Sequence, residues 1–175
     1  MSIHSDIANH LSIARPADPL SLPALTLAYL GDTVYDLYVR TVLAETLRLP
    51  MRALHLEAAK HVCAAGQAAA YRRIEPALTE AEQAAFRRGR NAHSGTVPKH
   101  ADVRDYRVAT GLEALLGHLY LLGEDDRIGE LMRLVPKPSA WTGRTAASGW
   151  ARTAATRSSP SSTRSSSRVS DDSLT

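Results

Sequence analysis

Leu-Ala-Tyr-Leu-Gly-Asp-Thr-Val-Tyr-Asp, residues 27–36, is the stretch of this chain that most strongly constrains its fold. Large apolar residues recur through and just beyond it at helical spacing, at Leu27, Leu30, Val34 and Leu37. A glycine inside a helix costs about 1 kcal/mol relative to alanine, so Gly31 indicates that a neighbouring element or a ligand comes close at this point. The pattern predicts a long helix that begins at an N-cap, Ser21, and ends near Leu47.

Two acidic residues stand out because each lies in an otherwise apolar run. Asp32 follows Gly31, and Glu113 lies within Thr-Gly-Leu-Glu-Ala-Leu-Leu-Gly, residues 110–117. A carboxylate on an apolar helix face costs several kcal/mol unless a cation or hydrogen bonds compensate it. Two such carboxylates that meet across a helix pair can hold a divalent metal ion, which would make the chain an enzyme.

The pattern alone leaves structural explanations of these acids open. Asp32 and Asp36 could be solvated residues on the polar side of an amphipathic helix, or Asp36 could support a site formed by Asp32. Glu113 could occupy an exposed edge position or form a buried ion pair with Arg40 or Arg107. None of its helical neighbours three or four positions away can pair with it.

The composition of the 175 residues excludes several classes of protein. Cys63 is the only cysteine, so neither an intramolecular disulfide nor a cysteine-based zinc site can form, and a reducing, cytoplasmic setting fits. Beside Ala64 and Ala65, Cys63 is interpreted as a small buried residue. No signal peptide is evident, and no apolar run approaches the ~18 residues of a membrane span. We therefore expect a cytoplasmic protein with no membrane partner.

Capping residues and helix breakers predict the other helices. We expect a short helix near residues 7–13, an alanine-rich helix over 51–74, a helix over 80–91 that begins at a Thr79–Glu82 capping box, a helix from Asp102 or Asp105 to Gly123, and a last helix from Asp125 or Asp126 to Leu134. No strand-like alternation persists, so the predicted fold class is an all-α helical bundle.

Changes in composition divide the chain into an N-terminal segment (1–20), a helical domain (21–135) and a tail (136–175). The tail is rich in Ser, Thr and Arg and is predicted to be disordered; its abrupt onset would also fit a shifted reading frame. The five arginines and two aspartates that follow Ser139 account for the whole formal charge of +3. The helical domain is therefore neutral, and any attraction to nucleic acid must be local.

One segment supplies such local charge. From Arg87 to Arg107 there are six Arg or Lys residues and two Asp residues, a net charge of +4. Arginines around a glycine at a helix end, followed by a polar loop, suit phosphate contacts, although a solvated loop is the common fate of a charge run. The candidate contacts are Arg87, Arg88, Arg90, Asn91 and Lys99.

Four segments together resemble the Mini-ribonuclease III family, a compact branch of the ribonuclease III superfamily. The matching segments are residues 27–40, the positions Leu54, His55, Val62, Ala64 and Gln67, residues 86–92, and residues 106–121. The resemblance covers about residues 20–134, and agreement of four ordered segments is far more specific than any one of them.

The resemblance implies an all-helical endonuclease domain that dimerises through the helix of Asp32. It implies Mg²⁺-dependent cleavage of double-stranded RNA, maturation of the ends of precursor 23S ribosomal RNA, and a ribosomal protein as a further partner that could present the substrate. Asp32 and Glu113 would be the catalytic, metal-binding residues, and the basic segment would bind RNA. Ribonuclease III proper has further acids where this chain has Ala28 and Thr110, and the Mini-III branch shares that difference.

Three other functions agree less well with the sequence than a nuclease does. A catalytically inactive RNA-binding or ribosome-assembly module is disfavoured because both Asp32 and Glu113 are present. A nucleotide phosphohydrolase of the His-Asp type is disfavoured because the chain has no adjacent His-Asp pair. A purely structural dimer would leave an acid in each apolar run unexplained.

Overall fold

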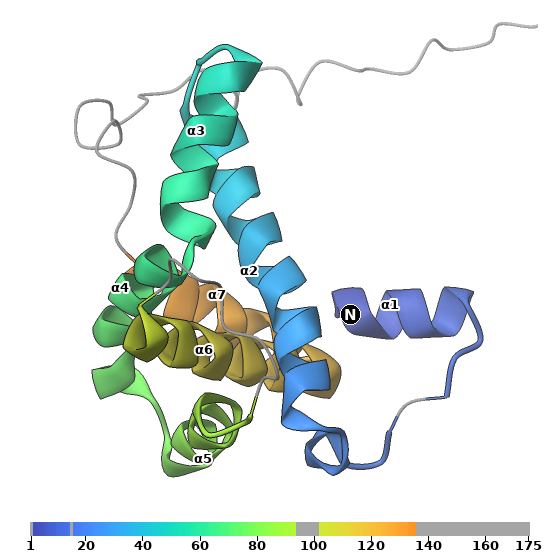
Figure 1. Ribbon diagram of the computed structural model, residues 1–175. Coiled ribbons are helices and arrows are strands. Elements are labelled where there is room, and N and C mark those ends of the chain that lie inside the picture. The colour runs from blue at the N-terminus through green and yellow to red at the C-terminus, as the bar shows by residue number, and fades with distance from the viewer. Residues whose placement is uncertain (1, 15, 94–101, 136–175) are drawn as a thin grey trace, which may run out of the picture. The chain divides into compact units, whose positions relative to one another are not determined.

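The computed structural model describes residues 2–14, 16–93 and 102–135, and every regular element within them is a helix (Figure 1). The elements are α1 (Ile3–His10), the 3₁₀ turn η1 (Pro19–Ser21), α2 (Ala24–Thr46), α3 (Met51–Val62), α4 (Ala64–Ile74), η2 (Glu75–Ala77), α5 (Glu80–Arg90), α6 (Val103–Leu122) and α7 (Asp125–Leu134). The prediction of an all-α fold is confirmed. Lys99 and the tail from Pro136 onward lie outside the described residues.

Helix α6 is the central element of the core. It packs against α2, α4, α5 and α7 (Figure 1), and its residues Leu112, Leu115 and Leu116 are at most 1% exposed. A helix so apolar must be covered on most of its faces, which explains why four other helices surround it. Glu113 therefore lies on the element that the rest of the domain is built around. In the part of the chain that is described, no helix is long and apolar enough to cross a membrane.

Two glycines let α2 and α6 touch backbone to backbone. A Cβ atom on Gly31 would overlap the carbonyl oxygen of Glu113 and lie 2.7 Å from the amide nitrogen of Gly117. A Cβ atom on Gly117 would in turn overlap the carbonyl oxygen of Leu27. The close approach predicted from Gly31 is thus a helix-helix crossing, and its partner is a second glycine.

The predicted start of the long helix at Ser21 is wrong by a few residues. Ser21 belongs to η1, where its hydroxyl donates a hydrogen bond to the carbonyl of Asp18 (2.6 Å), so it cannot cap α2. Helix α2 begins at Ala24, with Pro23 at the N-cap position. The short helix expected near residues 7–13 lies earlier, as α1.

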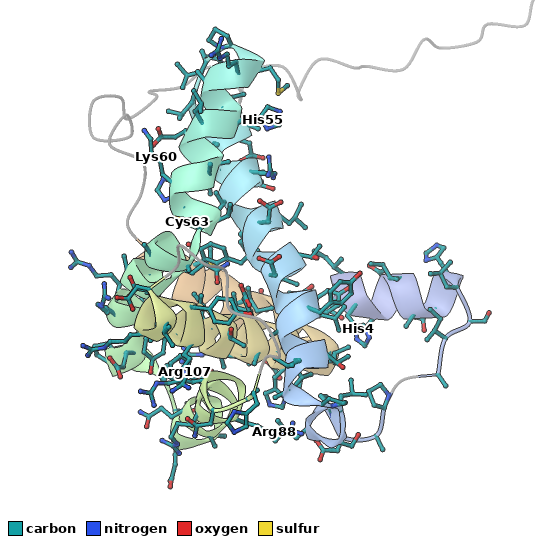
Figure 2. All side chains as sticks on the ribbon, viewed as in Figure 1. His4, His55, Lys60, Cys63, Arg88 and Arg107 are labelled. Atoms are coloured by element: carbon teal, nitrogen blue, oxygen red, sulfur yellow. The ribbon has the colours of Figure 1, made fainter. Side chains whose placement is uncertain are left out.

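The predicted single helix over 51–74 is also wrong, because the chain breaks at Cys63. This residue has extended backbone angles (φ −72°, ψ 160°) and separates α3 from α4. Helix α3 packs against α2 whereas α4 packs against α6 and α7, and one straight helix could not cover both surfaces. At this corner Cys63 is exposed rather than buried, and Figure 2 shows it between the two helices.

Several predicted caps are confirmed. Thr79 and Glu82 form a reciprocal capping box, Asp102 caps α6, and Gly123 ends α6 with a left-handed backbone (φ 79°). The predicted cap of α7 is wrong, since the N-cap is Glu124 and both candidate aspartates lie in the first turn. The carboxylate of Asp125 instead accepts a hydrogen bond from the backbone amide of Ile3 (2.7 Å).

Arg127 ties α7 to the start of α5. Its guanidinium pairs with Glu82 (2.7 Å) and Glu130 (2.9 Å) and donates to the carbonyl of Ala77 (2.7 Å). Glu82 is only 7% exposed, and the hydrogen bond from Arg127 lowers the pKa of its carboxyl group. The pair thus joins two helices that are distant in sequence.

We expect Arg127→Gln to lower the free energy of unfolding at pH 7 by about 2 kcal/mol, because it leaves a buried carboxylate without its cation. The lowered pKa of Glu82 means that the ion pair stabilises the fold above the unfolded-state pKa and stops doing so as the pH falls through the folded one. Urea unfolding of wild type and variant at pH 7 and pH 3 measures this. A difference as large at pH 3 as at pH 7 would contradict the assignment.

Candidate metal and catalytic site

The α2–α6 crossing brings Asp32 and Glu113 to the same place. Asp32 directly follows Gly31, and the backbone of Glu113 is what Gly31 touches. The two carboxylates are close enough for the charge of Asp32 to raise the pKa of Glu113. Asp32 is exposed and Glu113 is partly buried, so at least the Asp32 side of the pair is open to solvent.

A third polar side chain joins them from α4. Gln67 is 1% exposed, and its Nε2 donates to Oδ1 of Asp32 and to the carbonyl of Val62, both at 3.3 Å. The same amide interacts with the carboxylate of Glu113. From the sequence, Gln67 is named only within the family resemblance and has no predicted place at the site. A polar amide in an alanine-rich helix is the available signal, but the partner helices are distant in the chain.

Both carboxyl groups have raised pKa values. Burial, followed by the charge of Asp36, raises the pKa of Asp32, while the hydrogen bond from Gln67 opposes this. Burial raises the pKa of Glu113 to about 7, with Gln67 again opposing and Asp32 adding to the increase. Perturbed carboxyl groups of this kind are typical of functional sites.

The alternative ion-pair partner Arg40 is engaged elsewhere. Its Nε lies 2.7 Å from Oδ2 of Asp36, four residues earlier in α2. Asp36 is therefore paired with Arg40 on the helix surface, and its negative charge raises the pKa of Asp32. Among the described residues, no ion pair joins Glu113 to Arg40 or Arg107, so its charge must be compensated in another way.

The donor set fits a hard divalent cation. Among the described residues, no group of three or more His, Cys, Asp or Glu side chains could hold a metal ion, so a soft or fully caged metal is not accommodated there. Mg²⁺ is bound through one or two carboxylates and keeps several waters and substrate oxygens. Gln67 Oε1, which is buried and has no hydrogen-bond partner in the described part of the chain, is an unused acceptor on the amide whose Nε2 contacts Asp32.

Glu113→Gln should stabilise the metal-free protein at alkaline pH. The folded state keeps a proton on Glu113 up to about pH 7, whereas the unfolded chain releases it near pH 4.5. Between these values the folded state binds more protons, so the stability of the wild type falls as the pH rises through this window. In EDTA at pH 8 we expect Glu113→Gln to be more stable by about 2 kcal/mol, and its stability to vary less with pH. Urea unfolding at pH 5 and pH 8 measures both, and a variant less stable than wild type at pH 8 would refute the argument.

Basic side chains gather at a second place, between α4, α5 and α6. A recess of about 370 Å³ is lined by four arginines, the stacked rings of Tyr71 and Phe86, and neighbouring side chains. The four arginines are Arg72, Arg87, Arg90 and Arg104. We call these four residues the arginine rim.

The candidate RNA contacts are placed differently by the fold. Arg87 and Arg90 belong to the arginine rim. Arg88 lies on another side of α5, where its Nη2 donates to the carbonyl of Leu22 (2.7 Å; Figure 2). Asn91 is the exposed C-cap of α5, and Lys99 lies outside the described residues. Arg72 and Arg104 were not among the sequence-based candidates and come from helices on either side.

The domain is thus all-helical, with two acids at a glycine crossing of α2 and α6 and a basic recess between α4, α5 and α6. Residues 25–124 match the Ribonuclease III domain family, and the chain belongs to this family.

Similar proteins indicate which branch of the ribonuclease III family the chain resembles. The chain is 48% identical over 119 residues to Mini-ribonuclease 3 of Symbiobacterium thermophilum, covering 68% of this chain and 92% of that protein. It is also 48% identical over 115 residues to Mini-ribonuclease 3 of Thermoanaerobacter sp., covering 66% and 81%. A crystal structure of a protein from Fusobacterium nucleatum matches with a TM-score of 0.59 and 29% identity, covering 64% of this chain and 89% of that one. The resemblance to Mini-ribonuclease III is confirmed, and the chain is an endoribonuclease of the ribonuclease III type.

Proposed function

We propose that the protein cleaves double-stranded RNA with Mg²⁺ and matures the ends of precursor 23S ribosomal RNA in the cytoplasm. The observation that carries the proposal is the convergence of Asp32 and Glu113, beside Gln67, at the backbone crossing of α2 and α6. The assignment of the ribosomal precursor, and of a ribosomal protein that presents it, follows the family resemblance.

Three side chains would have distinct roles at the metal site. Asp32 and Glu113 would hold Mg²⁺, and Gln67 would keep Asp32 in place through its 3.3 Å hydrogen bond. When bound, the ion supplies the chemistry of lowering the pKa of an attacking water and neutralising charge on the phosphate. Burial raises the pKa of Glu113, and a cation held there would lower it again, because a nearby positive charge favours the ionised carboxylate.

A homodimer would give one site for each RNA strand. An apolar recess of about 340 Å³ is lined mainly by α1 and α2, with side chains of α6 and α7. Its lining includes Tyr29, which is 76% exposed, and Leu37, which is 51% exposed. Exposed apolar side chains gathered on one face mark interaction surfaces. We infer that a second copy covers this face of α2, and a twofold axis there would place two cleavage sites on one duplex.

The arginine rim and Asn91 would contact the RNA backbone, with Arg88 and Lys99 as the remaining candidates from the sequence. A-form duplexes are recognised mainly through their shape and phosphates, and guanidinium groups bind phosphates in bidentate geometry. The arginine rim draws on three helices, so its side chains are spread over a surface rather than along one loop.

The test is cleavage of an end-labelled precursor ribosomal RNA duplex, beside a single strand of the same sequence, with and without Mg²⁺. We expect cuts in the duplex alone, only with Mg²⁺, and offset on the two strands to leave short 3′ overhangs. Duplex binding without cleavage at any Mg²⁺ concentration would refute the nuclease and support the alternative of a ribosome-assembly module. Cleavage of the single strand would refute duplex specificity.

Arg104→Gln tests the arginine rim at a residue that was not among the sequence-based candidates. We expect duplex affinity to fall about 3- to 10-fold and the slope of log affinity against log salt to decrease by about 1, because one phosphate contact is lost. Filter binding in EDTA at several salt concentrations measures this without cleavage. The control is Arg133→Gln, which removes the same charge from an exposed position on α7; equal losses in both variants would show an effect of net charge alone.

A further inference from the structure

We propose that Gln67 is a positioning residue of the metal site, whose Oε1 accepts a hydrogen bond from a hydration water of the ion while its Nε2 fixes Asp32. The inference deepens the proposed function and rests on it. It concerns a side chain from α4, whereas both carboxylates come from α2 and α6.

The first observation is that Gln67 is buried at a cost that packing alone does not explain. The residue is 1% exposed and stands in a helix whose neighbours are mostly alanine. A buried amide must find hydrogen bonds, since an unsatisfied polar atom costs about 1–3 kcal/mol. An apolar side chain of similar volume would fill the same space without this requirement.

The second observation is that only half of this amide is satisfied. Nε2 donates to Asp32 and to the carbonyl of Val62, but Oε1 has no partner within the described residues. The hydrogen bond to Asp32 determines which way the amide faces, because a carboxylate oxygen needs a donor and not a second acceptor. Oε1, on the same amide group, is therefore left as an unused acceptor.

The third observation is that the two carboxylates cannot complete a Mg²⁺ shell. The ion takes six oxygen ligands in an octahedral arrangement and usually retains several waters. Each such water is a strong donor that needs an acceptor in the protein or the substrate. Gln67 Oε1, an unused acceptor on the amide whose Nε2 contacts Asp32, would accept one of them. Partners of this outer kind commonly change metal affinity by about 10- to 100-fold.

The experiment measures Mg²⁺ binding to the full chain by calorimetry in the absence of RNA. Gln67→Leu removes the acceptor and the donor but keeps much of the volume, and we expect its Mg²⁺ affinity to fall by at least about tenfold. Gln67→Glu keeps an oxygen acceptor and should retain Mg²⁺ binding. The control is Gln83→Leu on α5. Gln83 donates to the carbonyl of Leu78 (3.5 Å) and accepts from Arg87 (3.4 Å), and neither contact involves the carboxylates, so its loss should leave Mg²⁺ affinity unchanged.

Cleavage kinetics supply a readout that a purely structural role would not alter. In Gln67→Leu the Mg²⁺ concentration for half-maximal cleavage should rise at least about tenfold, while the duplex affinity in EDTA stays at the wild-type value. Unchanged Mg²⁺ affinity in Gln67→Leu, with normal binding by wild type, would overturn the role of Gln67 and leave the proposed function standing. Absence of Mg²⁺ binding by the wild type would overturn both. If Gln67→Leu fails to fold, Gln67→Met takes its place, since it also removes both the donor and the acceptor, and unchanged Mg²⁺ affinity in that variant would overturn the proposal.

Discussion

Asp32→Asn is expected to reduce Mg²⁺-dependent cleavage of an RNA duplex by at least about 1,000-fold while the protein stays folded. The amide keeps the shape of the carboxylate but removes the charge that would hold the ion. Folding should not suffer, because burial and Asp36 already disfavour the ionised form of Asp32 and raise its pKa. Duplex affinity in EDTA should be equal or slightly higher, since one negative charge near the phosphates is gone. Single-turnover cleavage and filter binding measure the two quantities.

The matched control for this variant is Glu130→Gln. It makes the same change from carboxylate to amide at a side chain that is 54% exposed and pairs with Arg127 on α7. Cleavage by Glu130→Gln should stay within about twofold of wild type, because a surface ion pair contributes little. If Asp32→Asn retained a tenth or more of wild-type cleavage, Asp32 would not be a metal ligand.

Gly31→Ala and Gly117→Ala are expected to be among the most destabilising single substitutions in the domain. In each case the added methyl group would overlap a backbone carbonyl of the opposite helix, which cannot rotate away as a side chain can. Overpacking of this kind costs about 1–3 kcal/mol or more, and it outweighs the gain of about 1 kcal/mol that alanine brings inside a helix. We expect each variant to unfold at a clearly lower urea concentration, and folded protein that remains should cleave slowly because the carboxylates have been moved apart.

Gly129→Ala separates the gain in helix propensity from the cost of overpacking. A Cβ atom on this α7 glycine would meet nothing closer than the Arg133 guanidinium, at 3.9 Å. The substitution should therefore stabilise the protein by about 0.5–1 kcal/mol through helix propensity. Urea unfolding of the three variants should give opposite signs for Gly129 and for the crossing glycines. Equal stabilities of Gly31→Ala and wild type would show that α2 and α6 can separate without cost.

The parts of the fold that depend on local chemistry could be predicted from the sequence. The capping box of Thr79 and Glu82, the cap at Asp102 and the left-handed end at Gly123 each involve residues within a few positions of one another. The break at Cys63 could not be predicted, because it depends on which surfaces α3 and α4 must cover. The role of Asp125 could not be predicted either, because its carboxylate accepts a hydrogen bond from α1 and does not cap α7, the helix in which it lies.

The parts of the candidate site that could be predicted are those where a residue is energetically unfavourable in its sequence context. Asp32 and Glu113 each stand out against apolar neighbours, and Gly31 is expensive in a helix, so both acids and the close approach could be inferred. The place of Gln67 at the site could not be inferred, because its hydrogen bond with Asp32 is made from a helix that begins some 30 residues later. For the same reason Arg72 and Arg104, which flank α5 in space, were not grouped with Arg87 and Arg90.

The corner at Cys63 also offers a spectroscopic advantage. The thiol is the only one in the chain, it is exposed, and its carbonyl accepts the backbone hydrogen bond of Gln67 (2.9 Å). A nitroxide attached there would report from one helical turn away on the side chain that touches Asp32. Paramagnetic Mn²⁺ in place of Mg²⁺ would broaden its signal, so occupancy of the two-carboxylate site could be followed in the unmodified sequence, with no cysteine to remove and none to introduce.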